Sequence, residues 1–383
     1  MKEADLAEAQ MPPALVKSEQ ATARSAWDAS RDFVTAVVVI ALLWFGLRLL
    51  RDPEAFVGLG DTVGKLVQAV LALVLGIGGI WALFIVANSL VERLPSRIAI
   101  VVRPWVFVLP AIAIVSVYLV YPAVRTIIQS FTEVPEGGGP FSNYTNAFGD
   151  HDVQIALRNN VIWLLIAPAL IVAVGLAFAA MTDRIKHESL AKTFVFLPLA
   201  ISGVAASVIW GFVYAWRIPG IPQVGILNAI VQAFGGETVA WLQTIPWNTF
   251  ALIVIMIWLQ VGFAMVILSA AIKGVPTEIT EAARIDGASE LQTFFRVLVP
   301  SIRGSIITVF TTVAIAVLKV FDIVFVMTGG NFDTSVVAVR MYDEMFRFRN
   351  FGQATTMAVI LFVAVVPIMV VNVRNLRKQG IGA

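Results

Sequence analysis

Eight apolar stretches, each long enough to cross a lipid bilayer, constrain what this chain can fold into. An α-helix rises about 1.5 Å per residue, so about 20 apolar residues cross the hydrocarbon core. The stretches lie at roughly 33–50, 65–90, 104–127, 157–180, 193–216, 249–272, 305–327 and 354–373. We therefore predict an all-α integral membrane protein with about eight transmembrane helices.

The composition excludes several classes of protein. Only 14% of the residues are charged and the mean hydropathy is +0.87, which leaves too little polar surface for a soluble protein. The chain has no cysteine, so disulfides, thiolate zinc sites and iron–sulfur ligation are excluded. A formal net charge of +2 gives no indication of a nucleic-acid partner.

The positions of the basic residues predict the orientation, because short cytoplasmic loops are enriched in lysine and arginine. The loops at 129–156 and 217–248 contain a single basic residue, Arg217. Most of the 27 basic residues fall in the other segments between the spans and at the ends. We therefore expect both termini to be cytoplasmic, with 1–32 as a cytoplasmic tail rather than a cleaved signal peptide.

The polar stretch TEAARIDGASELQTFFRVLVP (280–300), together with the residues from Pro276 that precede it, contains the start and stop signals of two short helices. A proline and two acids suit the first turn, and a glycine permits the left-handed conformation that ends a helix. A serine followed three residues later by glutamine fits a capping box. In chain order these residues are Pro276, Glu278, Glu281, Gly287, Ser289 and Gln292, with Pro300 limiting the second helix. We expect an ordered docking element rather than a linker.

At these residues the sequence resembles a known family, the binding-protein-dependent ABC importers, and within it the maltose-type sugar permeases. The loop resembles their EAA motif through Glu281, Ala282, Ala283, Asp286, Gly287 and Ala288, followed by Phe294, Val297 and Pro300. Three further stretches are similar to family motifs: FSNYTNAF (141–148), ALRNNVIW (156–163) and LKVFDIVFVMTGG (318–330). Val297, Val299 and Gly304 depart from the more usual residues without removing the likeness.

The resemblance implies a domain organisation. Residues 104–375 would form the six-helix core of a type I ABC importer permease, with the EAA coupling loop at 275–300 inside it. The two helices of 33–90 would be additional, as in the first permease subunit of maltose-type systems.

The resemblance also implies a partner and roles for the EAA residues. The helix that carries the motif would fit a groove on a separate ATPase subunit, with Glu281 in contact and Gly287 permitting the turn. An alternative for Glu281 is an i,i+3 surface pair with Arg284.

No catalytic or metal-binding constellation is visible, so we do not expect an enzyme. The chain lacks the phosphate-binding run G-x-x-x-x-G-K-[ST], and its two histidines, His151 and His187, lie in loops. No cofactor is expected on this chain, and ATP with Mg²⁺ would be used by the partner ATPase. The expected partners are a second homologous permease, two ATP-binding subunits, an extracytoplasmic solute-binding protein and lipid, in a bacterial inner membrane.

The predicted substrate pathway involves two helices. Trp258, Gln260 and Phe263 combine aromatic faces with an amide, as sugar sites do; equally, they are a packing face with Gln260 bonded to a neighbouring helix. Lys319 and Asp322 are three residues apart, which favours an ion pair, while the competing hypothesis places them on the pathway. The same helix lacks the amides of a maltose-type pocket, with Val313, Ala316, Val317 and Val320 on its expected pocket face.

The sequence therefore predicts a permease subunit of an ATP-driven sugar importer, for a disaccharide or oligosaccharide. The stretch MYDEMFRFRNFG (341–352) looks closest to α-glucoside permeases. The alternatives are an ion-coupled secondary transporter without an ATPase, a non-transporting membrane scaffold, and an ABC importer for a polyol or glycerophosphodiester.

Overall fold

The computed structural model describes residues 61–91, 96–183, 185–218 and 220–378, with scattered positions between 34 and 60. Every regular element in these ranges is a helix, which confirms the all-α prediction. Five helices are long and apolar enough to cross a membrane, and two bent helix pairs raise the number to seven. The tail 1–32 lies outside the described residues. The first expected span, 33–50, is described in part, as a shorter apolar helix over Val37–Leu50.

The chain divides into two compact units, with the boundary between Pro122 and Ala123. The first unit contains α3 (Asp61–Val91), α4 (Ser96–Val115) and the π-helical turn η2 (Ser116–Val120), which continues into α5 (Tyr121–Thr132). Phe84 on α3 stacks on Phe107 of α4, with ring centroids 5.7 Å apart. The most apolar 18-residue window of the helix Ile100–Thr132 contains no buried residue.

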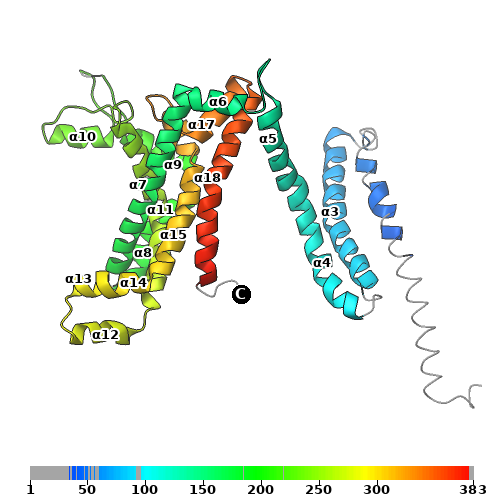
Figure 1. The fold of residues 1–383 in the computed structure, drawn as a ribbon, viewed down its shortest axis with the longest axis horizontal. Helices are drawn as coiled ribbons and strands as arrows, with labels where there is room; N and C mark the ends of the chain where they lie inside the picture. Colours follow the sequence, from blue (N-terminus) through cyan, green and yellow to red (C-terminus); the bar gives the residue numbers. More distant parts are fainter. Residues whose placement is uncertain are drawn as a thin grey trace, which may run out of the picture. The chain divides into compact units, whose positions relative to one another are not determined.

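Four long helices of the second unit run side by side (Figure 1). They are α7 (His151–Thr182), α11 (Trp247–Lys273), α15 (Arg303–Leu318) and α18 (Phe351–Lys378). A Cβ atom at Gly175 would come within 2.6 Å of the Ala264 side chain, so the missing side chain lets α7 and α11 pack at close range. Trp163, Leu252 and Met265 are fully buried in the core between these helices.

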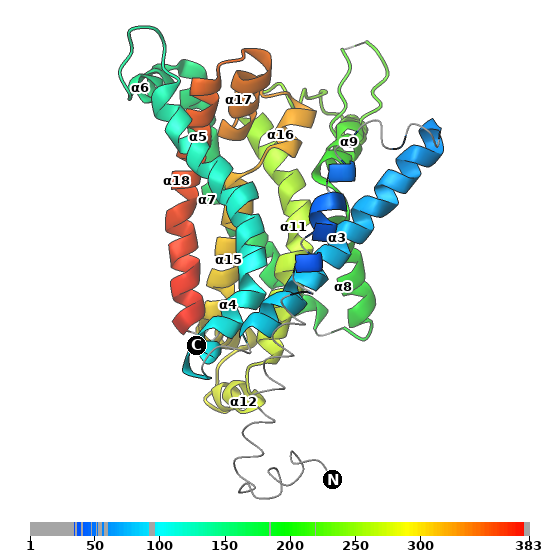
Figure 2. The ribbon, with the colours of Figure 1, turned by 90° about the vertical axis from the view of Figure 1, so that its right-hand side faces the viewer.

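Short helices occupy the two ends of this bundle (Figures 1 and 2). One end, called here the α12 end, carries α12 (Thr277–Ile285), α13 (Glu290–Thr293), the π-helical turn η4 (Phe294–Leu298) and α14 (Val299–Ser301). The opposite end, called the α17 end, carries α6 (Ser142–Gly149), α10 (Ile226–Ala233), α17 (Val337–Tyr342) and the π-helical turn η5 (Asp343–Arg347).

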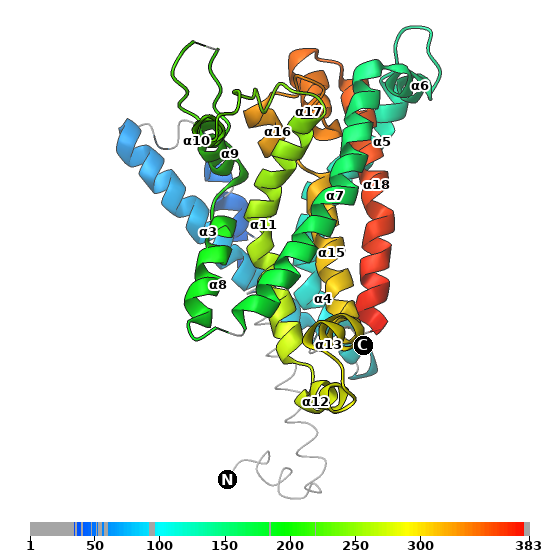
Figure 3. The ribbon, with the colours of Figure 1, turned by 90° about the vertical axis from the view of Figure 1, so that its left-hand side faces the viewer.

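The span expected at 193–216 is not one helix. It consists of α8 (Glu188–Phe196) with the 3₁₀ turn η3 (Leu197–Ala200), followed by α9 (Gly203–Val213). The helix direction bends by 104° between Glu188–Ala200 and Gly203–Val213. Figure 3 shows α8 on the side of the α12 end and α9 on the side of the α17 end. The hydroxyl of Ser202 accepts a hydrogen bond from the Ala205 N–H at 3.2 Å, which caps α9 after the break.

The span expected at 305–327 is also interrupted, because α15 ends at Leu318 and a separate helix, α16 (Asp322–Met327), follows. The amide of Asn160, on α7, donates to the Leu318 carbonyl at 3.3 Å and accepts from the Val337 N–H at 2.8 Å. The first bond supplies the Leu318 carbonyl with a partner in place of the one a continuing helix would provide, and the second ties the start of α17 to α7.

Candidate functional site

The turn between α12 and α13 is a complete Schellman motif. The Ala288 N–H donates to the Ala283 carbonyl and the Gly287 N–H donates to the Arg284 carbonyl, both at 3.0 Å. Gly287 has a φ of +83°, a conformation that side chains with a Cβ disfavour. Space is not the constraint, because a Cβ atom at Gly287 would meet nothing within 4 Å. The stop predicted at Gly287 is therefore confirmed.

The predicted capping box at the start of α13 is also present. The Ser289 hydroxyl accepts from the Gln292 N–H at 3.3 Å, and the Gln292 side chain accepts from the Ser289 N–H at 2.9 Å. Arg284 on α12 pairs with Glu290 on α13 at 2.9 Å. The i,i+3 pair considered between Glu281 and Arg284 is not found among the described contacts, since Arg284 turns to Glu290 instead. The two helices are therefore held as one ordered unit, as predicted.

This unit exposes apolar side chains at the α12 end. Ile285 is 85% exposed, Leu291 71% and Phe295 63%. Glu281 is exposed beside them, together with Ala282 and Asp286, while Ala283 and Ala288 are half-buried. Apolar groups of this size on an otherwise polar loop favour a surface that another protein covers.

A cavity of about 250 Å³ lies where the two broken spans meet α11. Its walls come from the break before α9, from the middle of α11 and from residues 316–323. Irregular backbone at membrane depth is tolerated where it lines a polar cavity, so the location of both breaks is accounted for.

Three of the predicted pathway residues line this cavity: Gln260, Lys319 and Asp322. The Gln260 side chain makes no hydrogen bond to any described residue, so the alternative of a bond to a neighbouring helix is not found. A Cβ atom at Gly203 would come within 3.1 Å of the Asp322 carboxylate, so glycine leaves room for Asp322 beside the start of α9. A carboxylate is favoured near a helix N-terminus.

The ion pair favoured for Lys319 and Asp322 is wrong. The i,i+3 geometry applies to residues of one helix, whereas α15 ends before Lys319 and α16 begins at Asp322. Both side chains are exposed, and no contact within 4 Å joins them in the described structure.

Two other predicted pathway residues do not reach the cavity. Trp258 packs edge-on against Trp210, with ring centroids 5.9 Å apart, and Phe263 packs against the hydrophobic core. Residues two positions apart point to different sides of a helix, which separates Trp258 from Gln260. Val313 and Val317 are likewise buried in the core, while Ala316 and Val320 line the cavity.

Phe321 is a cavity residue that the sequence reasoning missed. Its ring stacks on Phe325 at 4.8 Å, so one aromatic face is held in the wall of the cavity. In the sequence, its position directly before Asp322 could have indicated that Phe321 lies near the cavity.

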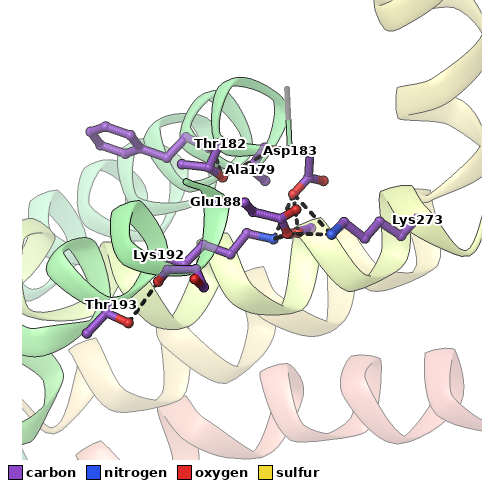
Figure 4. A network of polar contacts seen from close by, with 10 residues as sticks. Ala179, Thr182, Asp183, Glu188, Lys192, Thr193 and Lys273 are labelled. Carbon is purple, nitrogen blue, oxygen red and sulfur yellow. Dashed lines mark hydrogen bonds and ion pairs between the residues drawn. The ribbon is translucent and has the colours of Figure 1, made fainter. Parts of the chain in front are cut away.

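The α12 end of the bundle contains a network of charged side chains from three elements (Figure 4). Lys192 Nζ on α8 lies 2.7 Å from Asp183 Oδ1, just after α7, and 2.7 Å from Glu188 Oε1. The same ammonium group donates to the hydroxyl of Ser269 on α11, and that hydroxyl donates to Asp183 Oδ1 at 2.7 Å. Lys273, the last residue of α11, pairs with Glu188.

This network joins the EAA loop to the cavity. Only residues 274–276 separate Lys273 from the start of α12. Glu188 and Lys192 lie on α8, and the far end of α8 leads into the break that lines the cavity. A movement of α12 is therefore connected to the cavity by covalent chain and by ion pairs.

At the α17 end, Arg340 lies among carboxylates. Its Nη2 is 3.4 Å from Asp150 Oδ2 and 3.3 Å from Glu344 Oε1, and its Nη1 is 3.5 Å from Asp152 Oδ2. Burial raises the pKa of the Glu344 carboxyl, Arg340 opposes that rise, and the nearby charges of Asp150 and Asp343 add to it. The cluster borders a polar cavity of about 330 Å³.

Known proteins share this arrangement of helices and motifs. Residues 172–378 match the family described as "Binding-protein-dependent transport system inner membrane component". The chain belongs to this family. Members are components of membrane transport rather than enzymes, and the permease is accordingly a multi-pass protein of the inner membrane. Membership implies an ATPase and a solute-binding protein as partners.

Two relatives match this permease over nearly their whole length. The "Osmoprotective compounds uptake permease protein GgtC" of Synechocystis sp. is 50% identical over 274 residues, which cover 71% of this chain and 98% of that protein. The "Alpha-glucoside transport system permease protein AglF" of Rhizobium meliloti is 45% identical over 335 residues, which cover 83% of this chain and 99% of that protein.

A solved structure confirms the fold of the permease. A chain of a bacterial alginate ABC transporter, solved in complex with an alginate pentasaccharide-bound periplasmic protein, superposes with a TM-score of 0.61. The two are 19% identical, and the match covers 73% of this chain and 95% of that chain.

Proposed function

We propose that this permease is one of two membrane subunits of an ATP-driven importer for a disaccharide or short oligosaccharide, with an α-glucoside as the first candidate. The substrate class is supported by the name of the relative from Rhizobium meliloti, which is 45% identical. The chemistry of the cavity agrees with it, because an amide, an ammonium group and a carboxylate stand near the ring of Phe321. Sugar recognition combines an aromatic face with polar groups that bind hydroxyls.

The observation that carries the proposal is the capped helix α12. It ends in a Schellman motif and exposes Glu281 and Ile285 beside each other in space for a partner. A short helix with fixed ends moves as a rigid body when its partner moves, whereas a flexible loop would deform instead. We assign Glu281, Ala282, Ala283, Asp286, Gly287 and Ala288 to contact with, or orientation toward, the ATPase.

The proposed mechanism follows the connections from α12 to the cavity. ATP binding closes the partner ATPases and displaces α12, and α11 moves with it because few residues lie between them. The pairs of Lys273 and Lys192 pass this displacement to α8, which leads into the break that lines the cavity. The cavity then opens toward the other side of the membrane, and hydrolysis resets it.

The proposed assembly has the α12 end and both termini in the cytoplasm. Two ATP-binding subunits, which use ATP and Mg²⁺, would dock at the α12 ends of this chain and of a second homologous permease. The solute-binding protein would deliver sugar at the α17 end. Residues 104–375 would form the transport core, and the helices of 33–90 would be additional.

A second substrate class rests on a specific observation. The relative from Synechocystis that is 50% identical is named for osmoprotective compounds. A small polyol therefore remains the second candidate for the same cavity, because its hydroxyls would use the same amide and charged groups.

Co-purification tests the proposal. The tagged chain, extracted from its native membranes in mild detergent, should bring down an ATPase and a second permease in fixed ratio. Glu281→Ala should lower recovery of the ATPase and retain the second permease, while Glu237→Ala, an exposed acid outside the EAA loop, should change neither. Recovery of the folded wild-type chain alone, in several detergents, would instead favour a secondary transporter.

The role of the cavity has its own test. Lys319→Met removes the ammonium group from the cavity and should reduce ATP-driven uptake while the complex still assembles. Normal uptake in this variant would exclude an essential role of Lys319 in transport.

A further inference from the structure

A second cavity, of about 470 Å³, lies at the α17 end and is walled mainly by aromatic side chains. Its aromatic lining consists of Trp210 and Tyr214 at the end of α9, Trp241 in the loop before α11, and Trp247 and Phe250 in the first turn of α11. Leu227 on α10 closes one side. The volume is within the range of small-molecule sites, about 300–1,000 Å³.

This cavity faces away from the proposed solute pathway. At about 100° per residue, Trp247, Ala251 and Val254 lie within roughly 40° of the direction opposite to Met256 on α11. Met256 lines the cavity that contains Gln260, whereas the other three residues line the aromatic one. Trp247 is 66% exposed and Val254 43%, so this side of α11 is open to the surroundings of the described chain.

The aromatic cavity offers almost no polar group to a ligand. The Tyr214 hydroxyl already donates to the Ala251 carbonyl at 2.9 Å, and the Thr244 hydroxyl donates to the Ala240 carbonyl at 3.0 Å. The ring N–H of Trp241 is buried without an acceptor in the described part of the chain, so it is not accessible to a ligand in the cavity. A sugar would leave its hydroxyls unpaired here, which is costly, whereas a hydrocarbon chain would not.

The depth of the cavity matches the outer part of a bilayer leaflet. Trp247 begins the apolar helix α11, and Val254 lies about 10 Å further along it. Tryptophan and tyrosine are enriched at the level of the lipid head groups. The cavity therefore extends from that level into the hydrocarbon.

The helix α10 supports the same placement. Ile226, Ile230 and Phe234 are exposed at intervals of four residues, by 56%, 48% and 88%, and so form an apolar stripe. Figure 1 shows α10 lying across the direction of α11. The buried Asn228 amide fixes this helix through hydrogen bonds to Ala215 and Val239. A short helix with an apolar stripe, lying across the spans, is typical of the membrane interface.

We infer that the aromatic cavity binds one acyl chain of a phospholipid from the leaflet at the α17 end. The lining is apolar and aromatic, and the hydroxyls of Tyr214 and Thr244 are already hydrogen-bonded, which suits an acyl chain rather than a head group. The bound lipid would hold α9 and α10 against α11 at the outer ends of these helices. This inference needs only the membrane location of the permease and not its substrate.

Photocrosslinking in nanodiscs tests the inference. The assembled transporter is placed in phosphatidylethanolamine that carries a diazirine in its acyl chain, and the labelled peptides are identified by mass spectrometry. Labelling should concentrate on residues 210–254 in the wild type. Ala251→Phe fills the cavity and should reduce labelling there to background. The matched control, Val266→Phe, enlarges an exposed residue of α11 outside the cavity and should leave labelling unchanged.

A second variant keeps the test decisive if Ala251→Phe does not fold. Val254→Trp narrows the cavity from its exposed side, where a larger side chain can be accommodated, so labelling of residues 210–254 should fall in this variant too. Labelling spread evenly over all apolar helices would overturn the inference. So would labelling of residues 210–254 that is unchanged in a folded Ala251→Phe variant.

Discussion

Lys192 on α8 holds Asp183 at the end of α7, with 2.7 Å between the ammonium nitrogen and Oδ1. The side chains are only 19% and 12% exposed, so neither group is well hydrated. Ser269 bonds to both, which adds α11 to the contact. One ammonium group therefore fixes the α12 ends of three elements. Of these, α11 lines the solute cavity and α8 leads into the break that lines it.

Lys192→Met should destabilise the permease and weaken coupling. The substitution leaves the partly buried Asp183 carboxylate with the more distant Lys273, 3.9 Å from Oδ1, as its cation, which costs about 2 kcal/mol. Thermal unfolding of the purified complex should show a lower midpoint, and uptake per ATP hydrolysed should fall. Lys186→Met, which changes an exposed lysine in the same connection, is the control and should behave as wild type. Equal unfolding midpoints for the two variants would contradict the structural role of the network.

Gly287→Val should abolish ATP-driven uptake without loss of the folded chain from the membrane. A side chain with a branched Cβ at φ +83° costs about 1–2 kcal/mol and redirects α12. Gly287→Asn is the matched variant, because asparagine tolerates this conformation, and it should retain most of the uptake. Immunoblots of membranes and uptake assays measure the two effects. Full uptake in Gly287→Val would remove the requirement for a fixed turn.

Gln260→Ala should reduce sugar uptake by roughly ten-fold, since it removes the cavity amide that would bond a hydroxyl. The natural control is Trp258→Phe on the same helix, because Trp258 packs on Trp210 away from the cavity. That control should stay within the error of the assay. A larger defect in Trp258→Phe than in Gln260→Ala would show that the pathway runs on the other side of α11.

Glu344 predicts a pH dependence of stability at the α17 end. Its pKa is raised above the ordinary value of 4.5, mainly by burial. The folded chain therefore holds a proton that the unfolded chain releases, so the free energy of unfolding decreases as the pH rises above 4.5 toward the folded-state pKa. Glu344→Gln should flatten this dependence in pH-resolved thermal unfolding, and Glu237→Gln should not. If the stability of Glu344→Gln depended on pH as steeply as that of the wild type, the dependence would belong to another group.

Local signals account for the parts of the structure that the sequence predicted well. The stop at Gly287 and the capping box at Ser289 depend on residues within five positions, so their hydrogen bonds follow from the sequence pattern. Hydropathy found the spans because each is apolar over its whole length.

The helix breaks could not be predicted from local sequence. The break after Leu318 contains neither proline nor glycine, and its carbonyl is satisfied by Asn160, 158 positions away. The break before α9 had a partial signal in Pro198 and Gly203, but its 104° bend depends on contacts with distant parts of the chain. Lys319 and Asp322 lie at the break after Leu318, so the i,i+3 ion pair predicted for them on one continuous helix does not form in the described structure. Trp258 and Gln260 could have been separated from the sequence alone, because residues two positions apart do not share a helix face.

The most direct test of the central claim is solute uptake by the complete transporter in proteoliposomes, with its solute-binding protein outside and ATP inside. Our account predicts uptake of an α-glucoside that requires both ATP and the binding protein. It also predicts that Gly287→Val blocks this uptake in a complex that is otherwise assembled. Uptake driven by a proton or sodium gradient without ATP, and unaffected by Gly287→Val, would contradict it.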